Sequence, residues 1–153
     1  MIVFRLSKAT YALDLSGKGA EKTGGRWNSK GVPMVYTSSS RALCTAEIAV
    51  HLPLGLVPGG YNLTTLEIPE RLGFEEPDLN LLASGWKSFP YIRVTQQVGD
   101  TFIKNKKSLV MRVPSAVVQG DYNFLINPIH AGITEILVVK TELFIFDERL
   151  FRR

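Results

Sequence analysis

The sequence predicts a single α+β domain. Segments with strand character and segments with helical periodicity follow one another without the strict alternation that is typical of a parallel α/β sheet. The chain has 153 residues, an ordinary size for one domain, and it contains neither internal repeats nor low-complexity linkers. We therefore expect one compact domain over residues 1–153.

The first half of the chain predicts three strands and one helix. A loop over 7–31 that is rich in Gly, Lys and Ser, with room for one helical turn at 9–13, separates the first two strands. The helix is bounded by Ser40, a good N-cap, and by Pro53, which cannot continue a helix. The three strands are expected at 2–6, 33–37 and 61–69, and the helix is expected at 40–52.

The second half predicts two helices and further strands. The longer helix rests on apolar residues at helical spacing, despite Gly99, and it has a basic end. The strand after it is interrupted at Pro114, and residues 123–128 are expected to form a short piece flanked by turns. The short helix is predicted at 78–83 and the long helix at 90–107. The interrupted strand is predicted at 108–118, and the final one or two strands at 135–146.

Composition limits the classes of function. The formal net charge is +4, but the basic residues gather only at 104–107, the polar end of a predicted helix, and at 149–153, which we expect to be a solvated terminus. Neither cluster is interleaved with aromatic residues as in a single-strand-binding platform, so direct nucleic-acid binding is not expected.

Cysteine usage and hydropathy indicate the compartment. The only cysteine, Cys44, has no partner for an internal disulfide, and no Cys/His cluster has the spacing of metal ligands, so we expect a reducing compartment and no metal. No apolar run approaches the ~18 residues that a membrane span needs. We expect a soluble, cytoplasmic protein with no membrane association.

Glu47 is the most informative single position. On a helical wheel it lies close to the apolar stripe that contains Leu43 and Val50. Burying an unpaired carboxylate costs several kcal/mol, roughly, so Glu47 should have a cationic or hydrogen-bonding partner. A structural ion pair at a helix flank is the alternative. The expected partner is Arg26, whose planar guanidinium can also bind a phosphate or carboxylate with two hydrogen bonds.

Arg26 belongs to the loop "GGRWNSKG", residues 24–31. The two glycines before Arg26 permit close backbone approach. Trp27 is costly to leave exposed, and Asn28 can serve as a turn residue or a ligand amide. Tyr36 ends the strand that follows, so its ring could lie at the mouth of the same pocket and stack on a flat heterocycle; simple packing is the alternative.

A second group of polar residues lies in one loop-rich region near the C-terminus. Ser115 lacks the GxSxG elbow of a serine hydrolase, which leaves it as a hydrogen-bond donor to a ligand. The two histidines are too isolated to be metal ligands, although His51, one turn after Glu47, could border the pocket. The group consists of Ser115, Tyr122, Asn123, Asn127 and His130.

The ordered set of motifs resembles the RES domain family, toxins of bacterial toxin–antitoxin pairs that are named for an Arg, a Glu and a Ser. The matching segments span almost the full chain: "VFRLS", "GGRWNSKGVPMVYTS", "ALCTAEIAVHL", "VGDTFI", "RVPSAVV", "YNFLINPIH" and "FDERL". The resemblance implies a fold similar to that of ADP-ribosyltransferases, and cleavage of NAD⁺ at the nicotinamide–ribose bond by a glycohydrolase or phosphorylase.

The resemblance also implies roles for individual residues. NAD⁺ is then a substrate, with phosphate left open as a co-substrate, and no other cofactor is implied; the absence of a GxGxxG motif agrees with this. The implied partner is an antitoxin with an Xre-like helix-turn-helix domain, and a homodimer within that complex is left open. The implied catalytic residues are Arg26, Tyr36, Glu47 and Ser115, and the implied NAD⁺-binding residues are Arg26, Trp27, Asn28, Tyr36 and Asn127.

Two other functions remain open at this point. One is transfer of ADP-ribose onto a protein or nucleotide acceptor, which uses the same residues. The other is an RNA-binding or ribonucleolytic toxin, which rests on the basic cluster at 104–107 and predicts binding that weakens steeply with salt.

Overall fold

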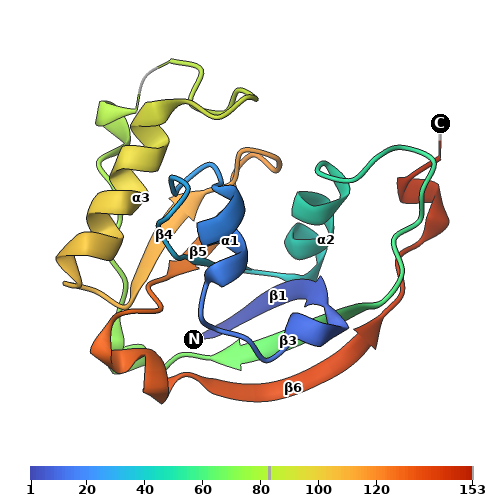
Figure 1. The fold of residues 1–153 in the computed structure, drawn as a ribbon, viewed down its shortest axis with the longest axis horizontal. Helices are drawn as coiled ribbons and strands as arrows, with labels where there is room; N and C mark the ends of the chain where they lie inside the picture. Colours follow the sequence, from blue (N-terminus) through green and yellow to red (C-terminus); the bar gives the residue numbers. More distant parts are fainter. Residues whose placement is uncertain (83, 153) are drawn as a thin grey trace.

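The core of the molecule is one antiparallel sheet with the strand order β4-β5-β2-β1-β3-β6 (Figure 1). The computed structural model describes residues 1–82 and 84–152. The strands are β1 (Ile2–Lys8), β2 (Val35–Ser38), β3 (Tyr61–Glu67), β4 (Val110–Pro114), β5 (Tyr122–Ile126) and β6 (Leu137–Phe144).

The middle of the sheet opens between β1 and β2. These two strands share a single paired position, Phe4 with Ser38, whereas β1 pairs with β3 along its whole length, from Ile2 with Glu67 to Lys8 with Tyr61. The sheet therefore has two parts, β4-β5-β2 and β1-β3-β6, that separate beyond Phe4. A ligand site can form where two such strands diverge.

In the part of the chain that the structure describes, three α-helices cover the sheet: α1 (Lys18–Thr23), α2 (Arg41–Ala49) and α3 (Arg93–Asn105). The predicted cap is confirmed for α2, because Ser40 Oγ accepts a hydrogen bond of 3.0 Å from the Leu43 N–H. In Figure 1, α2 lies over β1, and α3 lies beside β4 at the other end of the molecule. Within the described residues, no helix is long and apolar enough to cross a membrane.

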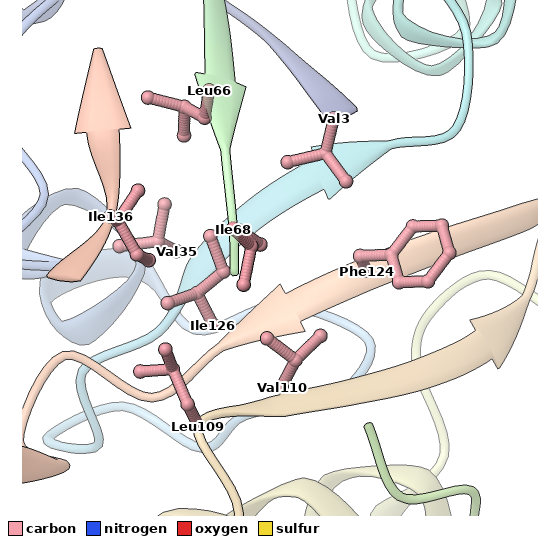
Figure 2. Packing of buried hydrophobic residues seen from close by; sticks show 9 residues of the cluster. All are labelled: Val3, Val35, Leu66, Ile68, Leu109, Val110, Phe124, Ile126 and Ile136. Atoms are coloured by element: carbon pink, nitrogen blue, oxygen red, sulfur yellow. The ribbon is translucent and has the colours of Figure 1, made fainter. Parts of the chain in front are cut away.

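Three buried clusters hold these layers together. Figure 2 shows the first, which joins both parts of the sheet: Val3, Val35, Leu66, Ile68, Leu109, Val110, Phe124, Ile126 and Ile136. The second lies between α3 and the strands β4 and β5, and it contains Trp27, Met34, Phe102, Ile103, Met111, Val113 and Leu125. The third lies under α2 and contains Leu6, Cys44, Leu63, Phe146 and Phe151.

Four sequence-based expectations were wrong in detail. The loop over 7–31 contains α1, and residues 123–128 belong largely to a full strand, β5. The helix predicted at 78–83 is a 3₁₀ turn over Leu79–Leu81, and its last residue, Ala83, lies outside the described residues. The C-terminal segment is not simply solvated, because Phe151 is only 1% exposed. The α+β class itself is confirmed.

Candidate functional site

A cleft of about 880 Å³ lies where β1 and β2 diverge, beneath α2. Its walls come from the Gly-rich loop before β2 with the adjoining end of α1, from strands β1 and β2, from helix α2 and the residues just after it, and from the segment that precedes α3. The turn after β4 and the start of β5 complete the lining. Of the predicted site residues, Arg26, Trp27, Tyr36 and Glu47 line this cleft. The structure thus brings together side chains that are distant in the sequence.

Glu47 is half-buried on the cleft side of α2 and is held by two neutral donors. Ser115 Oγ donates to Glu47 Oε1 at 2.8 Å, and Asn123 Nδ2 donates to the same oxygen at 2.5 Å. The expectation that Arg26 is the direct hydrogen-bonding partner was therefore wrong. The reason is topological, since the ends of β4 and β5 approach α2 from the sheet side.

The environment of α2 also differs from the predicted stripe. Val50, expected to be inside, is 56% exposed, whereas Leu43 and Cys44 are buried. Glu47 consequently lies at the border between the packed face and the cleft. Burial raises the pKa of the Cys44 thiol to about 11, and its Sγ donates to the Phe4 carbonyl at 3.0 Å.

Ser115 is 2% exposed and has a fixed hydrogen-bonding direction. Its Oγ accepts from the backbone N–H of Val117 at 3.0 Å and of Val118 at 2.9 Å. A hydroxyl has two lone pairs and one proton, so these two acceptances leave the proton for Glu47. Ser115 therefore orients the carboxylate and is itself held by the turn after β4.

Arg26 forms the opposite wall of the cleft. Its Nη1 donates to the carbonyls of Trp86 at 2.6 Å and Ser88 at 3.0 Å, and its guanidinium lies 5.0 Å from the centre of the Tyr91 ring. Burial lowers the pKa of Arg26, while Tyr91 and then Glu47 act in the opposite direction. Arg26 thus pins the segment before α3 to the Gly-rich loop and places a cation across the cleft from Glu47.

The hydroxyl of Tyr36 fixes the conformation of the Gly-rich loop. It donates to Asn28 Oδ1 at 2.7 Å and accepts from the Trp27 N–H at 3.1 Å. A Cβ at Gly25 would lie 2.6 Å from this hydroxyl oxygen, so the close approach requires glycine. Enclosure of the hydroxyl raises the pKa of Tyr36.

Helix α3 supports the same loop from behind. Gln96 Nε2 donates to the Gly25 carbonyl at 3.0 Å, and the Ser29 N–H donates to Asp100 Oδ1 at 2.9 Å. Gly99 lets the helix backbone pack directly on Trp27, because a Cβ there would lie 1.6 Å from the Trp27 carbonyl oxygen. The Arg26 backbone is therefore held on a rigid base.

Asn28 and Asn127 have hydrogen bonds that serve the fold. Asn28 Nδ2 donates to the carbonyls of Ala20 and Val32, both at 2.9 Å, and the side chain is fully buried behind the cleft wall. Asn127 Nδ2 donates to the Ile103 carbonyl at 3.1 Å, which ties the segment after β5 to the end of α3. Their contact with a substrate stays a prediction, and the structure gives both another role.

Two residues of the site were not predicted. Asn123 was noted only as part of a polar stretch, because its proximity to Glu47 depends on the pairing of β5 with β2. Tyr91 fell within the helix predicted at 90–107, but α3 begins at Arg93, and the Tyr91 ring packs edge-on against Phe89, with the ring centres 5.3 Å apart. In residues 1–82 and 84–152, no group of three or more His, Cys, Asp or Glu side chains is placed to hold a metal ion.

Comparison with known proteins identifies the family. The family model described as "RES domain" matches residues 2–147. The chain belongs to the RES domain family. This RES domain is 38% identical over 147 residues to the "Prs ADP-ribosylating toxin" of Sphingobium sp. (strain YBL2), an alignment that covers 94% of this chain and 91% of the relative. It is 33% identical to the "Toxin Res" of Pseudomonas putida over 99% of this chain and 100% of that protein.

A solved structure also shares the fold. The toxin–antitoxin complex of MbcT and MbcA from M. tuberculosis contains a chain that aligns with this RES domain at a TM-score of 0.63 and 19% identity. The alignment covers 98% of this chain and 86% of that one. The expected fold, an α+β domain similar to ADP-ribosyltransferases, is confirmed.

Proposed function

We propose that this RES domain is the toxin of a toxin–antitoxin pair and that it cleaves the nicotinamide–ribose bond of NAD⁺. The observation that carries the proposal is the Glu47 carboxylate, which Ser115 and Asn123 orient at a cleft whose opposite wall carries Arg26 and Tyr91. The relatives named as toxins, and the fold shared with a toxin–antitoxin complex, support it.

The chemistry of NAD⁺ suits a site with one carboxylate. When the bond between the ribose carbon and the nicotinamide nitrogen breaks, the electron pair goes to the cationic ring, and neutral nicotinamide leaves without a strong general acid. Positive charge develops on the ribose, and a nearby carboxylate stabilises it as in glycosidases. Glu47 supplies that carboxylate, and an oxygen of the acceptor then bonds to the ribose carbon and gives up its proton to the solvent.

The other walls of the cleft suit the rest of the ligand. Arg26 retains donors besides Nη1 that can bind the pyrophosphate, and the rings of Tyr36 and Tyr91 can pack against the nicotinamide or the ribose. The volume of about 880 Å³ lies in the range of about 300–1,000 Å³ that is usual for ligand pockets. The proposed catalytic set is Arg26, Tyr36 and Glu47, and Ser115, which does not line the cleft, acts through Glu47 by orienting its carboxylate.

The acceptor separates three versions of this reaction. Water gives ADP-ribose, phosphate gives a phosphorylated ADP-ribose, and a macromolecular acceptor retains the ADP-ribose label. The Sphingobium relative, named an ADP-ribosylating toxin, favours the last version as a second candidate. Incubation of the purified chain with adenine-labelled NAD⁺, with and without phosphate and with and without cell extract, distinguishes them by the labelled product. Labelled NAD⁺ that stays intact in every mixture would contradict the proposal.

The proposed partner is an antitoxin with an Xre-like helix-turn-helix domain. Expression of this chain alone is expected to arrest growth, and co-expression of the adjacent gene is expected to restore it. Arrest that persists with every neighbouring gene, or no arrest at all, would contradict this part of the proposal.

A further inference from the structure

The hydrogen bonds to the Glu47 side chain all end on one oxygen. Ser115 and Asn123 both donate to Oε1, at 2.8 and 2.5 Å. Oε2 accepts no hydrogen bond from residues 1–82 or 84–152. An ionised carboxylate accepts on both oxygens, so this arrangement assigns Oε1 to the protein and leaves Oε2 for a ligand in the cleft.

Asn123 is itself held by a second side chain of the sheet. It lies on β5 directly opposite Ser38 of β2, and Ser38 Oγ donates to Asn123 Oδ1 at 2.7 Å. An amide has a donor end and an acceptor end, and an ionised carboxylate can only accept. The Ser38 hydroxyl, by occupying the amide oxygen, therefore keeps the amide nitrogen directed at Glu47.

We propose that Asn123 is a positioning residue that, together with Ser38, turns the free oxygen of Glu47 toward the ribose of NAD⁺. This inference rests on the proposed cleavage of NAD⁺. Two side chains donate to Oε1 of Glu47: Ser115 from the turn after β4, and Asn123 from strand β5. Together they restrict rotation of the carboxylate. The oxygen that stabilises the ribose is thus placed before the substrate binds, which is how fixed dipoles and charges lower a barrier.

The Asn123→Asp variant tests this role, because it keeps the shape and replaces the donor with a carboxylate. At pH 8 the two carboxylates repel, and kcat for nicotinamide release is expected to fall about 10- to 100-fold, the factor for losing one hydrogen bond to a charged group. At lower pH two adjacent carboxylates share one proton, which restores a donor to Oε1. The ratio of variant to wild-type kcat is therefore expected to rise as the pH is lowered from 8 to 5, with KM nearly unchanged.

The ratio of variant to wild-type kcat is used because the other titratable groups around the cleft are present in both proteins, so their effect on kcat largely cancels. Those groups are Arg26, Tyr36, Cys44, His51, Lys87 and Tyr91. Asn62→Asp is the matched control, since it makes the same change at a half-buried position of β3 that does not line the cleft. Its kcat is expected to equal that of the wild type at every pH.

Ser38→Ala provides a milder variant that decides the matter if Asn123→Asp fails to fold. It frees the amide oxygen without removing the donor, and kcat is expected to fall by about 2- to 10-fold, the range for one neutral hydrogen bond. A wild-type rate for Asn123→Asp at pH 8, or a ratio that does not change with pH, would overturn the inference. A wild-type rate for Ser38→Ala would overturn the part assigned to Ser38. An inactive wild type instead contradicts the proposed function.

Discussion

Gly99→Ala is expected to damage the cleft from a position outside it. The added Cβ would lie 1.6 Å from the Trp27 carbonyl oxygen, 2.7 Å from the Trp27 carbonyl carbon and 3.0 Å from Met34 Cε. Carbon and oxygen atoms that are not bonded need a separation of about 3.2 Å, so α3 and the Gly-rich loop must move apart by roughly 1.5 Å. The shortest of these contacts is to backbone atoms of the loop, so no flexible side chain can move aside to make room for the added Cβ.

The displacement has two measurable effects. Overpacking of this kind costs about 1–3 kcal/mol of unfolding free energy, or more when backbone must move. For a chain of this size we expect a decrease in Tm of roughly 2–4 °C for each kcal/mol. Because Arg26 adjoins Trp27, a displacement of about 1 Å is also expected to lower kcat/KM for nicotinamide release by about 10²-fold.

The assays are thermal unfolding and steady-state nicotinamide release, with Gly19→Ala as the control. Gly19 lies in α1, and a Cβ there would meet nothing within 4 Å. Since Ala favours a helix over Gly by about 0.5–1 kcal/mol, this control is expected to be as stable as the wild type or slightly more stable. A Gly99→Ala protein with the Tm and kcat/KM of the wild type would refute the account of how α3 supports the loop.

Three further changes probe other parts of the molecule. Ser115→Ala leaves two half-buried N–H groups in the turn after β4, those of Val117 and Val118, without their acceptor and removes a donor from Glu47. Urea unfolding should show a loss of about 1–3 kcal/mol, together with a lower kcat. Phe151→Ala empties a position that is 1% exposed and should cost about 3–5 kcal/mol in the same assay, whereas Leu150→Ala, at 50% exposure, should cost much less. The folded-state pKa of Cys44 is raised to about 11, so its contribution to stability is present below its ordinary pKa and is lost as the pH rises toward 11. Urea unfolding between pH 9 and 11 should show this loss, roughly 2–3 kcal/mol, and Cys44→Ala should reduce it.

Local signals in the sequence were sufficient to predict the elements whose ends are marked by capping residues or by proline. Helix α2 was predicted because Ser40 caps it and Pro53 follows it, and the structure confirms the helix, although it ends at Ala49. Helix α1 was missed because it is short and contains Gly19, so it depends on its packing in the fold. Strand β5 was missed as a strand because its partners β2 and β4 lie elsewhere in the chain.

In the site, too, the features that depend on nearby residues could be predicted, and those that depend on distant parts of the chain could not. Glu47 could be singled out from its place on a helical wheel, since a carboxylate beside apolar residues needs partners. The identity of those partners could not be predicted, because Ser115 and Asn123 reach Glu47 only through the order of strands in the sheet. The buried position of Phe151 was missed for a similar reason, since the cluster around Leu6 and Leu63 that receives it forms only in the folded chain.

The role of Glu47 is the central claim, and nicotinamide release by Glu47→Gln tests it most directly. Gln keeps the size of the side chain and an oxygen that can accept from Ser115, but it removes the negative charge. We expect the wild type to release nicotinamide from NAD⁺ and the Glu47→Gln protein, folded with a similar Tm, to have a kcat lower by about 10²-fold or more. A folded Glu47→Gln protein that releases nicotinamide at the wild-type rate would contradict the account.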